Sequence, residues 1–371
     1  MIKILFLINT LGGGGAERAL VNLVNNMDSS EFAITVKTMF DGGVNTALLC
    51  DNVNYVNKKA PCPRGIAYFF KFIPSRLLYS YFVSGEEYDI LVAFMHGAPV
   101  KVIYGCKEKN TKTIGWLHNG NPETGTFFRF WFTKRQAFKA YSALDKLVGV
   151  SDNVSKKFSD YTGIKNISTV YNTNDVKKIR DGASEKFSLP FDKKGQLICS
   201  VGRLVKEKGF ERLISAVVRL RSEVPGLELM IIGDGEEAGR LNSLINGYGA
   251  GEYIHLVGFD INPYKYMIRS DFFVCSSYTE GLSTALTEAV ILGMPCVSTD
   301  VSGAKEILGE NNEFGIVTEN SEQGINEGMK RLLEDEKIAE HYRKKAEERA
   351  AFFDTENTVK QAEDLFLSLM N

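Results

Sequence analysis

The chain has 371 residues, of which 44% are hydrophobic and 24% are charged, which is an ordinary composition for a globular protein. It contains no run of the roughly 18 apolar residues that a membrane-spanning helix needs, and its length exceeds what one hydrophobic core usually supports. These properties exclude a membrane-spanning protein and predict two domains.

The net charge of −2 is unevenly distributed along the chain. Residues 1–175 carry 20 Lys and Arg against 14 Asp and Glu, which leaves 24 against 32 for the remainder. We expect the basic first half and the acidic second half to bind different partners. The six cysteines are scattered without a C-x-x-C pair, which favours the reducing cytoplasm over an oxidising compartment.

Short apolar runs alternate with helical patterns throughout, which is typical of parallel α/β sheets. In the first half, the predicted strands are 2–9, 33–40, 89–95, 113–118, 146–151 and 167–171. In the second half, they are 196–202, 227–233, 254–258, 272–276, 295–299 and 315–318. The polar segment 175–194 is predicted to connect the two sheets. Such sheets bind ligands at the carboxyl ends of their strands, so a facing pair predicts one cleft.

A glycine-rich loop joins the first predicted strand to the first helix. Gly14 and Gly15 precede Glu17 and Arg18, and glycine lets a ligand approach the backbone. The N–H groups of this loop are therefore predicted to cap a phosphate. The loop does not fit the dinucleotide pattern G-x-G-x-x-G, because Glu17 or Arg18 stands where the third glycine belongs.

Two segments of the first half, 64–82 and 127–141, interleave Lys and Arg with aromatic residues. A basic, aromatic helix can rest on an anionic bilayer. The alternative is that the aromatic rings belong to the core and the cations extend past them to water. Since both segments lie in the basic half, we expect this half to contact a membrane surface and to bind an acceptor substrate that is linked to a lipid. No recognised nucleic-acid motif accompanies them, so no nucleic-acid partner is expected.

His118 ends an apolar run and is therefore predicted at the carboxyl end of a strand, where a ligand would bind. A structural role for this histidine is the alternative. In the second half, Arg203 and Lys208 follow a predicted strand. A guanidinium fork and a lysine point charge can stabilise a leaving diphosphate without proton transfer. The alternative is that Arg203 and Lys208 belong to a run of charged residues exposed to solvent.

Glu280 and Glu288 stand eight positions apart at the front of a predicted helix. A solvated helix face is the usual explanation for such glutamates, but this helix is apolar nearly all round, which predicts buried carboxylates that need partners. On one helix their directions differ by about 80° and their heights by about 12 Å, so both carboxylates can reach one cleft. The amide groups of Gly281, Leu282 and Ser283 are predicted at the helix N-terminus, which suits an anion or sugar hydroxyl groups.

With these motifs, the chain resembles the retaining glycosyltransferases of the GT4 family, and the resemblance covers essentially its full length. The family has the GT-B fold, two Rossmann-like doubly wound α/β domains facing a central cleft. The resemblance rests on an E-x7-E pattern, an R-x4-K element and the glycine loop. It implies an N-terminal acceptor domain at 1–175, a C-terminal nucleotide-sugar donor domain at 176–353, and a last helix at 354–371 that crosses back to the first domain.

The resemblance also implies residue roles. It places His118 and Glu280 beside the donor sugar, Arg203 and Lys208 at the diphosphate, and Glu288 at the ribose hydroxyl groups. The first four are the candidate catalytic residues. Further donor contacts are implied for Gly14, Gly15, Gly258, Phe259, Gly281, Leu282 and Ser283.

The implied activity is that of a hexosyltransferase. It would move a hexose or N-acetylhexosamine from a nucleotide sugar, most commonly a UDP-sugar, to a glycan or lipid-linked acceptor. The usual setting is polysaccharide or lipopolysaccharide biosynthesis at the cytoplasmic face of the inner membrane. The sequence contains no Asp-x-Asp motif, so we expect no metal and no other cofactor, with Arg203, Lys208 and helix dipoles taking the place of the metal.

Two alternatives accompany this interpretation. A nucleotide-sugar epimerase has the same two-domain plan but needs no acceptor surface. A sugar-nucleotide-binding subunit without turnover would keep the binding residues, and release of UDP in the presence of acceptor would distinguish it from an enzyme.

Overall fold

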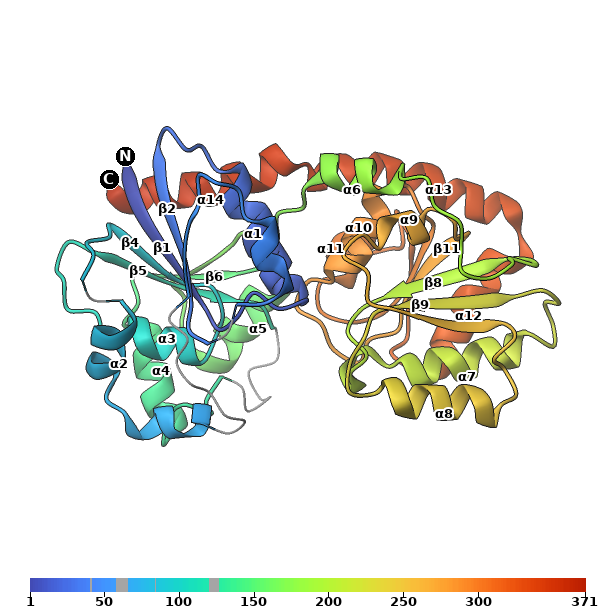
Figure 1. Ribbon diagram of the computed structural model, residues 1–371, viewed down its shortest axis with the longest axis horizontal. Helices are drawn as coiled ribbons and strands as arrows, with labels where there is room; N and C mark the ends of the chain where they lie inside the picture. Colours follow the sequence, from blue (N-terminus) through green and yellow to red (C-terminus); the bar gives the residue numbers. More distant parts are fainter. Residues whose placement is uncertain (41, 58–65, 84, 120–126) are drawn as a thin grey trace. The chain divides into compact units, whose positions relative to one another are not determined.

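The computed structural model describes residues 1–40, 42–57, 66–83, 85–119 and 127–371, with the side chains of 66–68 left out (Figure 1). The chain forms two compact units. Unit 1 comprises Met1–Thr173 together with Thr355–Asn371, and unit 2 comprises Asn174–Asp354.

Unit 1 is built on a seven-stranded parallel sheet of order β3-β2-β1-β4-β5-β6-β7. Its strands are β1 (Ile2–Ile8), β2 (Phe32–Thr38), β3 (Asn54–Asn57), β4 (Ile90–Ala93), β5 (Lys112–Leu117), β6 (Lys146–Gly149) and β7 (Ile167–Thr169). The strand order reverses between β1 and β4. A doubly wound sheet binds ligands at such a switch point, outside the carboxyl ends of the two strands.

Helices cover both faces of this sheet, with α1 beside α14 and α3 against α2 and α4 (Figure 1). They are α1 (Gly15–Asn26), α2 (Ser75–Phe82), α3 (Ala98–Ile103), α4 (Lys134–Ser142), α5 (Asp152–Thr162) and α14 (Thr355–Met370), with 3-10 turns at Val44–Leu48 and Ile66–Phe72.

The helix α14 belongs to unit 1 although it follows unit 2 in the sequence. Its fully buried Phe366 packs edge-on against Phe6 of β1, with ring centroids 5.9 Å apart, and lies 6.4 Å from the ring of Trp116 in β5. Hydrophobic burial on the sheet therefore holds the helix in place. This confirms the prediction that the last helix packs on the first domain.

Unit 2 has a six-stranded parallel sheet of order β10-β9-β8-β11-β12-β13. Its strands are β8 (Leu197–Val201), β9 (Glu228–Ile232), β10 (Ile254–Gly258), β11 (Phe272–Cys275), β12 (Cys296–Thr299) and β13 (Ile316–Thr318). Here the order reverses between β8 and β11, which sets the switch point of unit 2.

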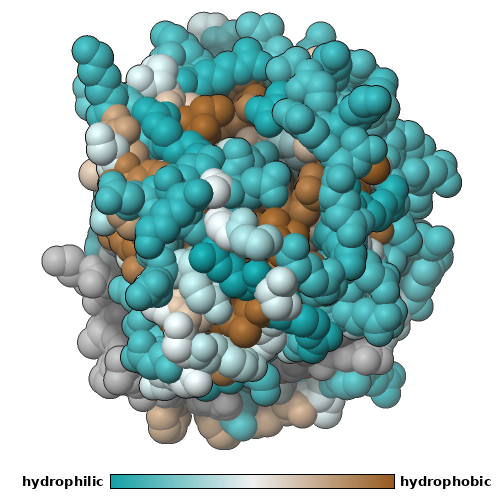
Figure 2. Space-filling model, turned by 90° about the vertical axis from the view of Figure 1, so that its right-hand side faces the viewer, coloured by the Kyte–Doolittle hydropathy of each residue, from teal (hydrophilic) through white to brown (hydrophobic). Residues whose placement is uncertain are grey.

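The helices of unit 2 also form two layers, with α7, α8 and α12 on one face and α6, α9, α10 and α13 on the other (Figure 1). They are α6 (Val176–Ala183), α7 (Phe210–Leu220), α8 (Ala238–Gly247), α9 (Tyr264–Met267), α10 (Thr284–Ile291), α11 (Ala304–Leu308), α12 (Glu322–Glu334) and α13 (Glu336–Ala350), with 3-10 turns at Lys206–Lys208 and Ala351–Phe353. The face of unit 2 in Figure 2 is mostly hydrophilic, and its apolar side chains occupy small separate areas.

The doubly wound α/β class is confirmed in both units, and the structure corrects two element predictions. The edge strand β3 has the sequence Asn-Tyr-Val-Asn, which lacks the apolar run by which the other strands were predicted. The segment 175–194 is not only a connection, because α6 begins there with the Asp175 side chain accepting a hydrogen bond from the Lys178 N–H. In the described part of the chain, no helix is long and apolar enough to cross a membrane.

Candidate functional site

Two cations and one carboxylate meet at the switch point of unit 2. Arg203 lies in the turn after β8, Lys208 ends the following 3-10 turn, and Glu280 lies in the loop after β11. Gly209 has a φ of 62°, and a Cβ there would collide with the carbonyl oxygen of Ser276. Glycine at this position therefore lets the Lys208 turn approach the end of β11.

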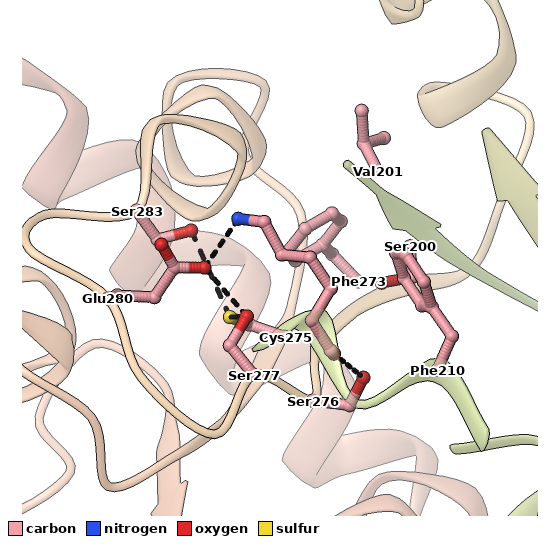
Figure 3. Close-up of a pocket in the computed structure, with 10 residues that line it drawn as sticks. Ser200, Val201, Phe210, Phe273, Cys275, Ser276, Ser277, Glu280 and Ser283 are labelled. Atoms are coloured by element: carbon pink, nitrogen blue, oxygen red, sulfur yellow. Dashed lines mark hydrogen bonds and ion pairs between the residues drawn. The ribbon is translucent and has the colours of Figure 1, made fainter. Parts of the chain in front are cut away.

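Lys208 and Glu280 form an ion pair in which Nζ and Oε1 are 2.6 Å apart. The Ser277 hydroxyl donates a second hydrogen bond of 2.6 Å to the same oxygen, and the side chains of Ser277 and Glu280 point toward one another in Figure 3. Burial opposes the lysine charge, but the attraction of Glu280 outweighs it and the pKa of Lys208 is raised. The lysine is therefore charged across the physiological pH range.

Arg203 has a different environment from Lys208. Its side chain is exposed, and it has no hydrogen bond or ion pair with any residue that the structure describes. Its positive charge acts to lower the pKa of Lys208. The guanidinium is thus close enough to add to the positive potential around Lys208 while its own donors stay available to an anionic ligand.

A buried arginine that sequence reasoning missed supports this loop. Arg212 of α7, only 5% exposed, donates to the carbonyl oxygens of Ser276 and Ser277 at 2.5–2.8 Å. It stacks under Tyr278, with its guanidinium carbon 3.9 Å from the ring centroid. Arg212 fixes the backbone that presents Ser277 to Glu280, and nothing in its helical sequence context distinguished it from a surface cation.

The structure corrects the placement of Glu280 and Glu288 on one helix. Ser283 is the N-cap of α10, its hydroxyl accepting a hydrogen bond from the Leu286 N–H, so Glu280 lies in the preceding loop. The backbone N–H groups of Gly281, Leu282 and Ser283 therefore belong to the approach to α10, as predicted, and all three residues are buried.

Glu288 is buried on α10, with 6% of its surface exposed. Its Oε1 accepts a hydrogen bond of 2.7 Å from the hydroxyl of Tyr264, the first residue of α9. A buried carboxylate needs such partners, which agrees with the expectation that this residue is not part of a solvated face. The tyrosine could not be predicted, because it is 24 residues away in the sequence.

The remaining candidate positions of unit 2 lie at the ends of β9 and β10. Gly233, directly after β9, donates a hydrogen bond of 2.8 Å to the carbonyl oxygen of Gly258, and a Cβ on Gly233 would collide with the carbonyl oxygen of Gly202. Gly258 has a φ of 82° and open space on its Cβ side, and the ring of Phe259 is 52% exposed. This region thus offers open space beside Gly258 and an exposed aromatic face on Phe259.

In unit 1, Gly14 and Gly15 lie where α1 begins, after β1. Asn45 holds this loop, since its backbone N–H donates to Leu11 and its side chain donates to Gly12. The Glu17 carboxylate lies directly against Gly14. A phosphate at these N–H groups would have to share them with Glu17.

His118 follows β5, as predicted, with its ring centroid 4.8 Å from that of Phe94. Burial lowers its pKa to about 3. A second histidine, His96, follows β4, and burial lowers its pKa to about 4. His96 was not singled out, although it directly follows the predicted strand 89–95 and stands at the same end of the strand that neighbours β5.

The two basic, aromatic segments are close together in unit 1. Phe72 and Phe132 make an edge-to-face contact with centroids 5.3 Å apart, and both rings are about 60% exposed. Phe69, Leu77 and Tyr81 are exposed as well. Arg64, the first residue of the predicted surface, lies outside the described residues. Among the described residues, no group of three or more His, Cys, Asp or Glu side chains could hold a metal ion.

Two doubly wound parallel units, with two cations and one carboxylate at the switch point of the second, fit the GT-B class of glycosyltransferases. The family model for glycosyl transferases group 1 matches residues 181–349. An N-acetylgalactosamine-N,N'-diacetylbacillosaminyl-diphospho-undecaprenol 4-alpha-N-acetylgalactosaminyltransferase from Campylobacter jejuni is 30% identical over 98% of both chains. The chain therefore belongs to the glycosyl transferases group 1 family and is a glycosyltransferase.

Solved structures agree on the fold. HepE from Anabaena, in complex with UDP and glucose, superposes with a TM-score of 0.78 at 19% identity and covers 99% of this chain and 100% of its own. Sucrose-phosphate synthase from Thermosynechococcus elongatus gives the same TM-score at 16% identity, with 100% and 99% covered. The predicted GT-B fold and the predicted enzyme class are both confirmed.

Proposed function

We propose that this enzyme is a retaining, GT4-like glycosyltransferase that moves a hexose or N-acetylhexosamine from a UDP-sugar to a lipid-linked or glycan acceptor. The observation that carries the proposal is the arrangement of Arg203, Lys208 and Glu280 at the switch point of unit 2. The Campylobacter jejuni relative, whose name includes a diphospho-undecaprenol, supports a lipid-linked acceptor. The bound UDP and glucose of the HepE structure support the donor class.

The chemistry follows from where charge develops. When the bond between the sugar C1 and the diphosphate breaks, negative charge grows on the leaving phosphate. The available donors of Arg203 and the ammonium of Lys208 stabilise that charge. The acceptor oxygen bonds to C1 on the same face, and its proton passes to the leaving phosphate, because none of the candidate residues is assigned as a nucleophile.

The carboxylates have separate tasks in this proposal. Glu280 holds Lys208 in place and accepts hydroxyl hydrogen bonds of the sugar, and Glu288 accepts those of the ribose. His118 contacts the transferred sugar, and Gly258 and Phe259 hold the base. Neither an epimerase nor a non-catalytic subunit is favoured by a specific observation, and family membership favours the transferase.

The deciding experiment measures UDP release from UDP-glucose, UDP-galactose, UDP-N-acetylglucosamine and UDP-N-acetylgalactosamine, with and without undecaprenyl-diphosphate-linked acceptor. We expect release with one donor, only in the presence of acceptor, and unchanged by EDTA because Arg203 and Lys208 take the role of a metal. Glu288→Ala should abolish it, whereas Glu252→Gln, an exposed control, should not. Failure of every donor, or indifference to Glu288→Ala, would overturn the proposal.

We further propose that the exposed surface formed by Phe69, Phe72, Leu77, Tyr81 and Phe132 rests on the cytoplasmic face of the inner membrane. The same segments carry cationic side chains, namely Lys71, Arg76, Arg129, Lys134 and Arg135, and Lys71 Nζ lies 5.0 Å from the Phe72 ring centroid. Each cation near an anionic surface contributes about 1 kcal/mol, and the aromatic rings suit the interface.

Co-sedimentation with vesicles tests the membrane contact. The protein should sediment with vesicles that contain anionic phosphatidylglycerol and much less with neutral phosphatidylcholine vesicles. The double variant Phe72→Ser, Phe132→Ser should lose most of this binding, whereas Tyr248→Ser, which removes an exposed aromatic ring of unit 2, should retain it. Equal binding of all three proteins would exclude this surface.

A further inference from the structure

The switch point of unit 1 contains a histidine that the proposed function leaves without a task. Strands β1 and β4 flank this switch point, and His96 lies three residues after the end of β4. Ligands of doubly wound sheets bind at such positions. His96, after β4, therefore occupies the position in unit 1 that Glu280, after β11, occupies in unit 2.

The pairing of two neighbouring strands places His96 and His118 at the same edge of the sheet. Strands β4 and β5 pair in parallel from Ile90 opposite Lys112 to Ala93 opposite Gly115, and each histidine follows the carboxyl end of its strand. The ring of Phe94, two residues before His96, lies 4.8 Å from the ring of His118. The presence of His96 also contributes to the lowered pKa of His118.

Each histidine is held by an aromatic neighbour and has one ring nitrogen without a partner. The His96 ring stacks on Phe127 with centroids 4.1 Å apart and planes 12° from parallel, and the His118 ring lies against Phe94. In the described part of the chain, neither Nδ1 of His96 nor Nε2 of His118 has a hydrogen-bond partner, and both atoms are buried. Buried polar atoms normally have partners, so these two nitrogens at one edge of the sheet are candidates to bind a ligand.

The chemistry of the two rings selects the kind of ligand. Burial lowers the pKa of His96 to about 4 and that of His118 to about 3, so both imidazoles are neutral at pH 7. A neutral imidazole offers one N–H donor and one acceptor nitrogen. A phosphate oxygen only accepts and favours protonated partners, whereas a hydroxyl group both donates and accepts and satisfies either ring nitrogen. The aromatic neighbours suit the C–H face of a sugar ring.

We propose that His96 is a second sugar-binding residue, which together with His118 binds hydroxyl groups of one sugar ring at the carboxyl ends of β4 and β5. This inference rests on the proposed function for the presence of a sugar substrate. The sugar is either the one transferred or the one that receives it, and the kinetic test below separates these two sources.

The direct test is a nuclear magnetic resonance experiment on the histidine rings. The chain has only four histidines, at 96, 118, 255 and 341, so their ring ¹⁵N signals can be resolved and assigned by single replacement. Addition of the UDP-sugars, and separately of the methyl glycosides of the same four sugars, should shift the signals of His96 and His118 for at least one ligand. His255 and His341 serve as internal controls and should not shift. Signals of His96 that stay fixed with every ligand would overturn the inference.

The kinetic test uses two replacements of His96. His96→Phe keeps a ring that can stack on Phe127 but removes both nitrogens, and His96→Asn places an amide near the position of Nδ1. We expect His96→Phe to lower kcat/KM about tenfold or more, as one lost hydrogen bond to a ligand does, and His96→Asn to stay within about threefold of the wild type. Binding of UDP alone and the melting temperature should be unchanged in both. A rise in KM for the UDP-sugar identifies the transferred sugar, and a rise in KM for the acceptor identifies the receiving sugar.

The outcomes separate this inference from the proposed function. Turnover by the wild type together with wild-type kinetics for His96→Phe would overturn the inference and leave the proposed function intact. If the wild type shows no turnover but ligands shift the signals of His96 and His118, the proposed function is overturned and the inference stands. A purely structural role for His96 would lower the melting temperature of both variants alike and would also contradict the inference.

Discussion

Arg203 and Lys208 differ in the bonding partners of their side chains in the absence of a ligand. Lys208 is already neutralised by Glu280 at 2.6 Å, whereas Arg203 is exposed and has no such bond within the part of the chain that the structure describes. An incoming diphosphate would therefore meet the charge of Arg203 first. In the proposed reaction, Lys208 acts from a preorganised position, which avoids the cost of orienting a flexible side chain.

Replacement of Lys208 by Ala should reduce kcat about 100-fold, which is the usual cost of removing one group that stabilises developing charge. It should also lower stability, because Glu280 would keep Ser277 as a partner but lose its counter-ion. The matched control is Lys206→Ala, which removes an exposed lysine from the same 3-10 turn. UDP release and thermal unfolding measure both effects, and equal activity of the two variants would exclude the role given to Lys208.

Two partly buried histidines, His96 and His118, make stability depend on pH. Their pKa values are about 4 for His96 and about 3 for His118 in the folded protein, below the ordinary value of 6.5. Below pH 6.5 the unfolded chain therefore binds protons that the folded protein does not, so the free energy of unfolding falls as the pH drops toward 4. Each histidine accounts for up to about 3 kcal/mol of this loss by pH 4.

Denaturant unfolding at pH 7 and pH 4 should show this loss in the wild type and a smaller one in His118→Phe. His341→Phe, which replaces an exposed histidine, should keep the wild-type difference. The same pH difference in all three proteins would show that His118 is not buried as a neutral group.

The sequence could identify most candidate side chains but not their partners. Glu288 was predicted as buried from the apolar residues around it, whereas its bond to Tyr264 depends on how α9 packs. Glu280 was predicted on a helix because spacing alone does not show that Ser283 caps α10. The exposure of Arg203 likewise depends on the turn after β8 and could not be read from its neighbours.

At the scale of elements, the turns after β8 and β9 approach each other backbone to backbone. Leu204 N–H donates to the carbonyl oxygen of Asp234 at 2.9 Å, and Gly233 leaves no room for a side chain beside Gly202. This contact fixes the turn that carries Arg203.

Gly233→Ala should therefore push the two turns apart and weaken UDP binding about tenfold or more, whereas Gly249→Ala should not affect it. Gly249 also has a positive φ, 63°, but its Cβ side is open, so its replacement tests backbone strain without the collision. Isothermal titration with UDP measures the difference, and equal affinities would show that the turn contact does not position the site.

The contact between α14 and the sheet of unit 1 should contribute strongly to stability. Phe366→Ala removes a fully buried ring that touches Phe6, Phe32 and Trp116, and should cost about 3–5 kcal/mol. Met370→Ala, at the exposed end of the same helix, should cost little. Urea unfolding monitored by circular dichroism gives both values, and similar midpoints would contradict the packing described for α14.

Strand prediction succeeded where a strand is apolar on both faces. Helices cover both faces of each sheet, so the central strands are continuous apolar runs whose identity does not depend on a choice of face. The edge strand β3 is held by backbone hydrogen bonds to β2 more than by apolar burial, so its sequence carries little signal. The helix α6 was not predicted because only two of its side chains, Ile179 and Ala183, are buried, and most of the residues around them in the sequence are polar.

Across the whole molecule, the sequence was most informative about the class of protein and least informative about specificity. Parallel strands and short motifs define the family. In the proposed binding of a sugar, the choice of sugar or acceptor depends on side chains such as His96, whose importance appears only when the pairing of β4 and β5 places it at the same sheet edge as His118. The contact between Phe72 and Phe132 likewise forms only when two segments distant in the sequence meet.

Unit 1 is formed by two separate stretches of the chain, which affects how it folds during synthesis on the ribosome. The strands of unit 1 leave the ribosome first, but the helix that covers Phe6 and Trp116 follows the whole of Asn174–Asp354. At typical rates of translation the delay is roughly 10 to 40 s. During that interval unit 2 can complete its own fold, while the nascent first sheet exposes an apolar face that chaperones recognise and that other nascent chains can bind.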